Sequence, residues 1–136
     1  GKFGPPGWQD DPDWTGWWGT NPPFHSPVFV LTRQPRVDLV LEGGTTFHFV
    51  DAAPHDVLRR AVDAADGLDV RLGGGPSSIR EFISAGLVDH LHVAVVPIVW
   101  GRGVSLWQGL EGFQDEYQTI SQTTPSGVTH ITFTRG

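Results

Sequence analysis

The sequence predicts an α/β domain with a mixed, mostly parallel sheet that is flanked by helices and ends in an antiparallel hairpin. Short apolar runs typical of strands alternate with amphipathic segments typical of helices, and the links between them are short. Two strand-like segments, Glu116–Thr123 and Val128–Thr134, flank the turn sequence Thr124–Gly127 and predict the hairpin. With 136 residues, the chain has room for one domain, residues 1–136.

The first 27 residues predict a long irregular arm. They hold six of the eleven prolines and four of the six tryptophans, which are Trp8, Trp14, Trp17 and Trp18. Frequent Pro and Gly prevent regular structure, so we expect a loop over 1–27 and an α/β body over 28–136.

The body opens with two predicted strands and a helix. Val28–Thr32 is a run of strand formers between prolines, which is typical of a central strand covered on both faces. Thr46–Val50 is the second strand. The helix that follows has one apolar stripe, made of Val57, Leu58, Ala61, Val62 and Ala65, and Gly67 is placed to end it.

The next part of the chain predicts a strand at Asp69–Leu72, a glycine-rich loop and a second helix. This helix has Ile79, Phe82 and Ile83 on its inner side and ends near Gly86. Residues 91–99 are nearly all apolar, so we expect a strand there that is buried on both faces.

Composition excludes several classes of function. The net charge of −6 and the pI near 5.3 argue against nucleic acid as a partner, because a polyanion requires a basic surface. Without cysteine, the chain has no disulfide, thiolate zinc site or cysteine nucleophile, and a cytoplasmic location is the default expectation. No apolar run is long enough to cross a membrane.

The glycine-rich loop is the strongest local signal for a binding site. Gly73, Gly74 and Gly75 would let a ligand approach the backbone, and Pro76, Ser77 and Ser78 would begin a helix with free amides for phosphate oxygens. The motif lacks the third glycine of a dinucleotide fingerprint and the Gly-Lys pair of a triphosphate loop. A plain tight turn before a helix explains these residues equally well.

Thr32 and Arg33 form a second candidate binding site at the end of a predicted strand, with Arg36 nearby. Ligands collect at the carboxyl ends of strands in open α/β sheets. An arginine beside a hydroxyl suits a monophosphate, such as the 2′-phosphate that distinguishes NADP from NAD. The simpler alternative is a solvated strand end.

Histidines and tryptophans were candidates for other chemistry. His90 and His92 alternate along a predicted strand, as a two-histidine metal pair would, but no third ligand follows at a suitable spacing, so we expect no metal site. The tryptophans could stack on sugars or bases, or fasten the arm to its own domain or to a partner subunit.

Five segments of the sequence resemble the dihydrofolate-reductase-like family, which includes the reductase domain of bacterial riboflavin biosynthesis. The resemblance covers essentially the whole chain and is most specific over residues 70–107. The segments are Pro27–Thr32, Glu42–Val50, Val70–Gly75, Gly86–His92 and Val96–Gly103.

The resemblance implies an NADPH-dependent reductase that transfers hydride to a small heterocyclic or carbonyl substrate. It makes Gly73–Ser78 residues for the cofactor pyrophosphate and makes Thr32 and Arg33 candidates for its 2′-phosphate. Gly1 and Lys2 would correspond to the Gly-Arg cofactor loop of the family. We also expect a homodimer. The alternative is a non-catalytic homodimeric or ligand-binding module on the same fold.

This sequence departs from the family pattern at several points. His90 stands where relatives carry an acidic residue, and Trp100 and Trp107 replace other residues. Family members begin with a strand whose acidic residue lies beside the substrate, and no such segment occurs in these 136 residues. We therefore expect either a longer protein or a truncated relative, and we assign no proton donor.

Overall fold

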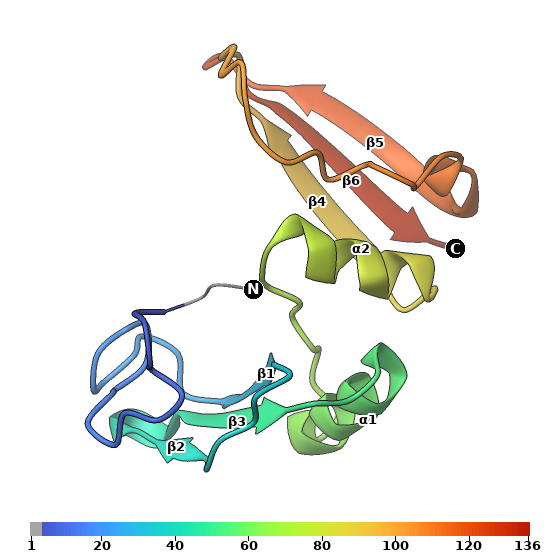
Figure 1. The fold of residues 1–136 in the computed structure, drawn as a ribbon. Helices are drawn as coiled ribbons and strands as arrows, with labels where there is room; N and C mark the ends of the chain where they lie inside the picture. Colours follow the sequence, from blue (N-terminus) through green and yellow to red (C-terminus); the bar gives the residue numbers. More distant parts are fainter. Residues whose placement is uncertain (1–3) are drawn as a thin grey trace. The chain divides into compact units, whose positions relative to one another are not determined.

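A computed structural model describes residues 4–136, which divide into two compact units (Figure 1). Unit 1 ends at Arg71, and unit 2 runs from Leu72 to Gly136. Each unit contains one three-stranded sheet, mixed in unit 1 and antiparallel in unit 2. The α/β class is confirmed, whereas the prediction of a single domain stays a prediction.

The sheet of unit 1 has the strand order β1–β3–β2. Strand β1 (Pro27–Leu31) runs parallel to β3 (Thr46–Val50), and the two-residue β2 (Leu39–Val40) runs antiparallel to it. A 3₁₀ turn at Glu42–Gly44 leads into β3. Both predicted strands are confirmed, but the expectation that the first is central is wrong. The central strand is β3, because β1 and β2 pair with its two edges.

The arm has no helix or strand over residues 4–26, as predicted, yet it supplies much of the core of unit 1. Trp8 and Trp14 are only 6% and 8% exposed and form a buried cluster with Phe47 and Phe49 of β3. The Trp8 and Trp14 ring centroids are 4.6 Å apart. Large aromatic side chains bury enough apolar surface to hold a segment that has no ladder hydrogen bonds.

Arg36, in the segment that follows β1, holds the arm in place. Its Nη1 donates a hydrogen bond to the carbonyl oxygen of Trp8 at 2.6 Å. Its guanidinium carbon also lies 5.4 Å from the Trp14 ring and 5.7 Å from the Phe49 ring. A guanidinium above aromatic faces adds an electrostatic attraction to the apolar packing.

Helix α1 (Pro54–Ala65) completes unit 1 and confirms the first predicted helix. Pro54 occupies the first turn, where its missing N–H costs nothing. The helix ends at Asp66, which has a φ of 49°, followed by Gly67 with a φ of 86°. Val57 is its buried residue.

Unit 2 contains helix α2 (Pro76–Ser84) and the strands β4 (His90–Val95), β5 (Tyr117–Thr123) and β6 (Thr129–Arg135). A short 3₁₀ helix, Phe113–Glu116, leads into β5. Strand β6 is central and pairs antiparallel with both neighbours. The second helix and the C-terminal hairpin are therefore confirmed.

Several expectations for residues 69–99 and for the direction of the strands are wrong. Residues 69–72 form no strand, since Asp69 and Arg71 leave only two side chains in that segment for burial. Strand β4 is largely exposed and antiparallel to β6, so the sheets are not mostly parallel. It also ends before residue 99, because Pro97 has no N–H to continue the ladder.

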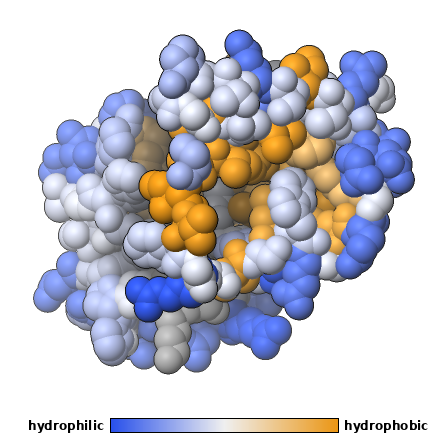
Figure 2. Space-filling model, turned by 90° about the horizontal axis from the view of Figure 1, so that it is seen from above, coloured by the Kyte–Doolittle hydropathy of each residue, from blue (hydrophilic) through white to orange (hydrophobic). Residues whose placement is uncertain are grey.

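The segment after β4 exposes many apolar side chains. Val99 is 98% exposed and Trp100 is 72% exposed. Figure 2 shows that apolar side chains, in orange, gather on the face of the molecule that it views. Further along this segment, Trp107 packs against Phe133 of β6, with the ring centroids 5.7 Å apart. The Phe113 ring centroid lies 5.2 Å from that of Phe133. The chain between β4 and β5 thus covers the sheet face that carries Phe133.

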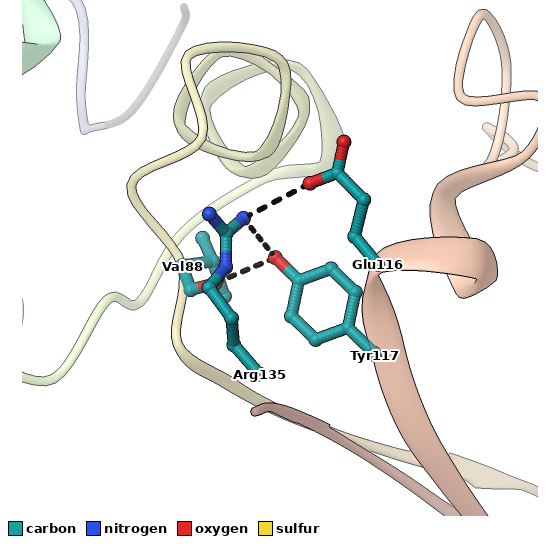
Figure 3. A network of polar contacts seen from close by, with 4 residues as sticks. All are labelled: Val88, Glu116, Tyr117 and Arg135. Atoms are coloured by element: carbon teal, nitrogen blue, oxygen red, sulfur yellow. Dashed lines mark hydrogen bonds and ion pairs between the residues drawn. The ribbon is translucent and has the colours of Figure 1, made fainter.

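A polar network joins both ends of the hairpin to the turn after α2 (Figure 3). Tyr117 lies opposite Arg135, and its hydroxyl donates a hydrogen bond to the Val88 carbonyl oxygen at 2.6 Å. Arg135 Nη2 donates to the Tyr117 oxygen at 2.9 Å and lies 3.5 Å from Glu116 Oε2. The hydrogen bond to Tyr117 is the main reason that the pKa of Arg135 is raised above its ordinary value.

Replacing Arg36 should destabilise unit 1. Arg36→Ala removes the hydrogen bond to Trp8 and the contacts with two aromatic rings, so we expect a loss of about 1–3 kcal/mol in the free energy of unfolding. Urea denaturation followed by tryptophan fluorescence measures it. Arg33→Ala is the control, since Arg33 is exposed, and should change stability by less than about 0.5 kcal/mol. Equal effects would contradict the role of Arg36.

Removing the Tyr117 hydroxyl should weaken unit 2. Tyr117→Phe leaves the Val88 carbonyl without its donor and Arg135 without its closer acceptor, and we expect a cost of about 1–3 kcal/mol. Thermal denaturation compares this variant with Gln118→Ala, a change at the next, exposed residue of β5. If both variants melt at the wild-type temperature, the network does not support the fold.

Candidate functional site

The glycine-rich loop leads directly into α2 and presents an open backbone. Gly74 has a φ of 140°, a conformation that L side chains rarely adopt. A Cβ atom built on Gly73 or Gly74 would meet no atom within 4 Å. The space in front of these two glycines is therefore free for a ligand, and packing within the chain does not explain them.

The start of α2 has the properties of an anion site. Gly75 precedes the helix in an extended conformation, and its carbonyl accepts the first helical hydrogen bond, from Ile79 N–H at 3.2 Å. The amides of Ser77 and Ser78 come before that bond and have no partner within the helix. No acidic side chain occupies the first turn of α2. Phosphate oxygens fit such a helix terminus through the amides and the helix dipole.

Arg80 connects this helix to the segment after β4. Its Nη1 donates a hydrogen bond to the Ser105 carbonyl oxygen at 2.5 Å. The Arg80 guanidinium, on the second turn of α2, is therefore hydrogen-bonded to the backbone of that segment. The groups of the helix terminus that are left for a ligand are therefore its amides and the two serine hydroxyls.

Thr32 and Arg33 follow β1 at its carboxyl end, as predicted. The Thr32 amide extends the ladder by donating to the Val50 carbonyl at 2.9 Å, and its Oγ1 accepts a hydrogen bond from Gln34 N–H at 3.1 Å. Arg33 is exposed and forms no ion pair among residues 4–136. Arg36 is committed to the arm, so Arg33 is the available cation of the two.

The predicted cofactor residues are divided between the units. Thr32 and Arg33 belong to unit 1, and residues 73–78 belong to unit 2. Gly1 and Lys2, the proposed counterpart of the Gly-Arg loop, lie outside the described residues. The assignment of these residues to one cofactor site stays a prediction.

The tryptophans of the arm serve packing and do not form a flat platform. Trp14 meets Trp17 at an interplanar angle of 89°, and Trp8 meets Trp17 at 59°. Trp18 is 62% exposed but stands edge-on to Phe24. A sugar-binding surface would require exposed, coplanar indoles, so the arm-fastening alternative describes unit 1 better.

An apolar recess of about 430 Å³ lies in unit 2, over the sheet face that carries Phe133. Trp107, Phe113, Ile131 and Phe133 give it apolar walls. Glu111 and Gln114 also line it.

The histidines of unit 2 pair in a way that the sequence did not predict. His92 contacts His130 of β6, whereas His90 contacts Thr134. The β4–β6 pairing joins segments far apart in the chain, and no spacing signals it. The contact of Tyr117 with Arg135 was missed as well, because counting outward from the predicted turn, Thr124–Gly127, places Tyr117 opposite Thr134, one residue before its actual partner.

Two negative observations concern residues 4–136 alone. No group of three or more His, Cys, Asp or Glu side chains is arranged to hold a metal ion in this part of the chain. Neither of its helices is both long and apolar enough to span a bilayer.

Comparison with known protein families decides the family. The sequence model of the RibD C-terminal domain family matches residues 8–131 of this chain. The chain belongs to the RibD C-terminal domain family. The resemblance to riboflavin-biosynthesis reductase domains is thereby confirmed. Among curated proteins, none matches the chain.

Solved structures of similar proteins agree with this RibD C-terminal assignment. A protein from Shewanella sp. PV-4, named "Putative riboflavin biosynthesis protein", matches 93% of this chain with a TM-score of 0.64 and 26% identity. This match shows a dihydrofolate-reductase-like fold. A pyrimidine reductase-like protein from Corynebacterium diphtheriae matches 70% of the chain with a TM-score of 0.50 and 20% identity. The chain spans 65% of the first protein and 40% of the second.

The two open glycines should respond differently to alanine. Gly74→Ala forces a side chain into a left-handed backbone region, and we expect a loss of about 1–2 kcal/mol in the free energy of unfolding. Gly73→Ala is the matched control, since it is the adjacent residue, has no such φ and has the same open space. Urea denaturation compares them. A Gly74→Ala variant as stable as the Gly73→Ala variant would show that the loop adopts another conformation.

Proposed function

We propose that this RibD C-terminal domain is an NADPH-dependent reductase domain that transfers hydride to a small heterocyclic or carbonyl substrate. One observation carries the proposal: an open glycine backbone precedes a helix terminus that has free amides and no acidic side chain in its first turn. A family match over residues 8–131 supports reading it as a cofactor site.

The residues present fit the phosphates of NADPH. In this proposal, the pyrophosphate lies against Gly73–Gly75 and accepts hydrogen bonds from the amides of Ser77 and Ser78. The open space at Gly73 and Gly74 admits phosphate oxygens next to the backbone, where a side chain would exclude them. Thr32 and Arg33 bind the 2′-phosphate, because Arg33 is an exposed cation without an ion pair among residues 4–136.

The chemistry of hydride transfer comes from the cofactor, and the protein contributes binding and orientation. Anchoring both phosphate groups fixes the position of the nicotinamide relative to the substrate, which lowers the entropic part of the barrier. The names of the two similar proteins support a heterocyclic substrate. The homodimer expected from the resemblance stays a prediction.

Nucleotide titration tests the cofactor and its 2′-phosphate together. We expect the full-length protein to bind NADPH more tightly than NADH in isothermal titration calorimetry. Arg33→Ala should weaken NADPH binding by roughly 10- to 100-fold, the effect of about 1.5–3 kcal/mol for a hydrogen bond to a charged group, and should leave NADH unchanged. Arg59→Ala is the control, because Arg59 is an exposed arginine of α1 that pairs with Asp56.

A second variant in the same titration tests the glycine loop. Gly73→Ala places a methyl group where the pyrophosphate would lie, so it should weaken NADPH and NADH equally. Absence of binding to either nucleotide by the wild-type protein would overturn the proposed function. Equal losses for Arg33→Ala with both nucleotides would overturn only the 2′-phosphate assignment.

A further inference from the structure

Two histidines of unit 2 meet on one face of its sheet. His92 lies on β4 opposite Thr132, and His130 lies on β6 opposite Ala94, so the histidines are diagonal neighbours across the two strands. Alternation along each strand directs both side chains to the same face. His92 Nε2 is 2.9 Å from His130 Nδ1.

The two imidazole rings meet edge to edge. Their planes are parallel within 1°, and their centroids are 5.2 Å apart, much farther than the two facing nitrogens. One ring therefore donates an N–H to the lone pair of the other. Because His92 is exposed and His130 is partly exposed, both rings can turn about their side-chain bonds, and water has access to them.

We propose that His92 and His130 form a two-histidine chelate for a divalent transition-metal ion, with Cu²⁺ preferred and Ni²⁺ next. Neutral imidazole nitrogens bind such ions at about 2.0–2.1 Å. In the hydrogen-bonded pair the two facing nitrogens point at each other, so both rings turn to direct their lone pairs at one ion. Cu²⁺ is preferred because nitrogen ligands bind it more tightly than they bind Ni²⁺ or Zn²⁺. Water would complete the coordination.

The surroundings of the pair suit a cation. The register and the alternation place no lysine or arginine from β4, β5 or β6 on this face. It carries the side chains of His90, Ala94, Gln118, Ile120, Gln122, Thr132 and Thr134. Gln122 lies directly opposite His130, so its side chain leaves the sheet on the same face as the pair. Arg135 belongs to the other face, with Phe133 and Tyr117.

His90 provides an internal contrast. It stands two residues before His92 on the same strand and face, but its Nδ1 lies 3.2 Å from Thr134 Oγ1. It has a hydroxyl as its neighbour and no second imidazole. The proposed site therefore needs one histidine from each of two strands, and the spacing of His90 and His92 alone does not create it.

Metal binding at this pair would link β4 to the central strand of unit 2. An ion that binds only the folded state stabilises it by mass action. Strand β4 precedes the exposed apolar segment, so the link would fix the strand from which that segment leaves the sheet. This inference does not depend on the proposed reductase function.

Titration of the full-length protein, without an added histidine tag, with CuCl₂ and NiCl₂ tests the site. We expect one Cu²⁺ to bind with the electron paramagnetic resonance signature of two imidazole nitrogens, and Ni²⁺ to bind more weakly. His92→Gln and His130→Gln should each weaken Cu²⁺ binding by more than roughly tenfold, since each removes a ligand. His90→Gln should bind as the wild type does.

Three outcomes would overturn the proposal. These are no Cu²⁺ binding by the wild type, unchanged binding by His92→Gln, and equal losses for all three variants. Circular dichroism verifies that the variants fold. If one does not, nuclear magnetic resonance of the wild type decides, because paramagnetic Cu²⁺ must broaden the side-chain signals of His92 and His130 before those of the other histidines.

Discussion

Burial of large aromatic side chains is the constraint on which unit 1 depends. Its sheet has a two-residue edge strand, and only one of its helices is regular, so backbone pairing alone supplies little stability. The arm compensates, because Trp8 and Trp14 cover Phe47 and Phe49 on one face of β3. Arg36 completes the cover by joining the chain after β1 to the Trp8 carbonyl. The segment after β1, which includes both residues of one candidate phosphate site, is thereby tied to the arm at Arg36.

In unit 2, backbone pairing around a central strand takes the place of the aromatic cluster of unit 1. Strand β6 pairs along its whole length with β5 and along six residues with β4. This leaves one apolar face, covered by Trp107 and Phe113, and one polar face, which carries three histidines. The separation explains why an apolar recess and a histidine pair occur on one small sheet without competing for space.

The sequence predicted local elements well and long-range pairing poorly. Both helices and the hairpin have signals within a few residues, such as Pro54 and Gly67 at the ends of α1. The partner of β4 has no such signal, because apolar runs do not state whether their neighbour is parallel or antiparallel. The exposure of β4 was missed for the same reason: an apolar run predicts burial, but only the arrangement of the other strands determines it.

The same distinction between local and long-range features applies to the candidate site. A loop of three glycines before Pro76 could be located by reading the chain, since its properties are local. The open space at Gly73 and the separate uses of Arg33 and Arg36 could not, because they depend on what lies nearby in three dimensions. The histidine pair could not be predicted for the same reason, because His92 and His130 are 38 residues apart in the sequence.

The arrangement of the indoles also gives the two units separate optical signals. Trp8, Trp14 and Trp17 have ring centroids between 4.6 and 5.6 Å apart, close enough for their electronic transitions to couple. Coupled indoles produce a circular dichroism signal that vanishes when the cluster loosens. The tryptophans of unit 2, Trp100 and Trp107, are not part of this cluster. Loss of order in the arm can thus be followed in the intact protein without attaching a probe.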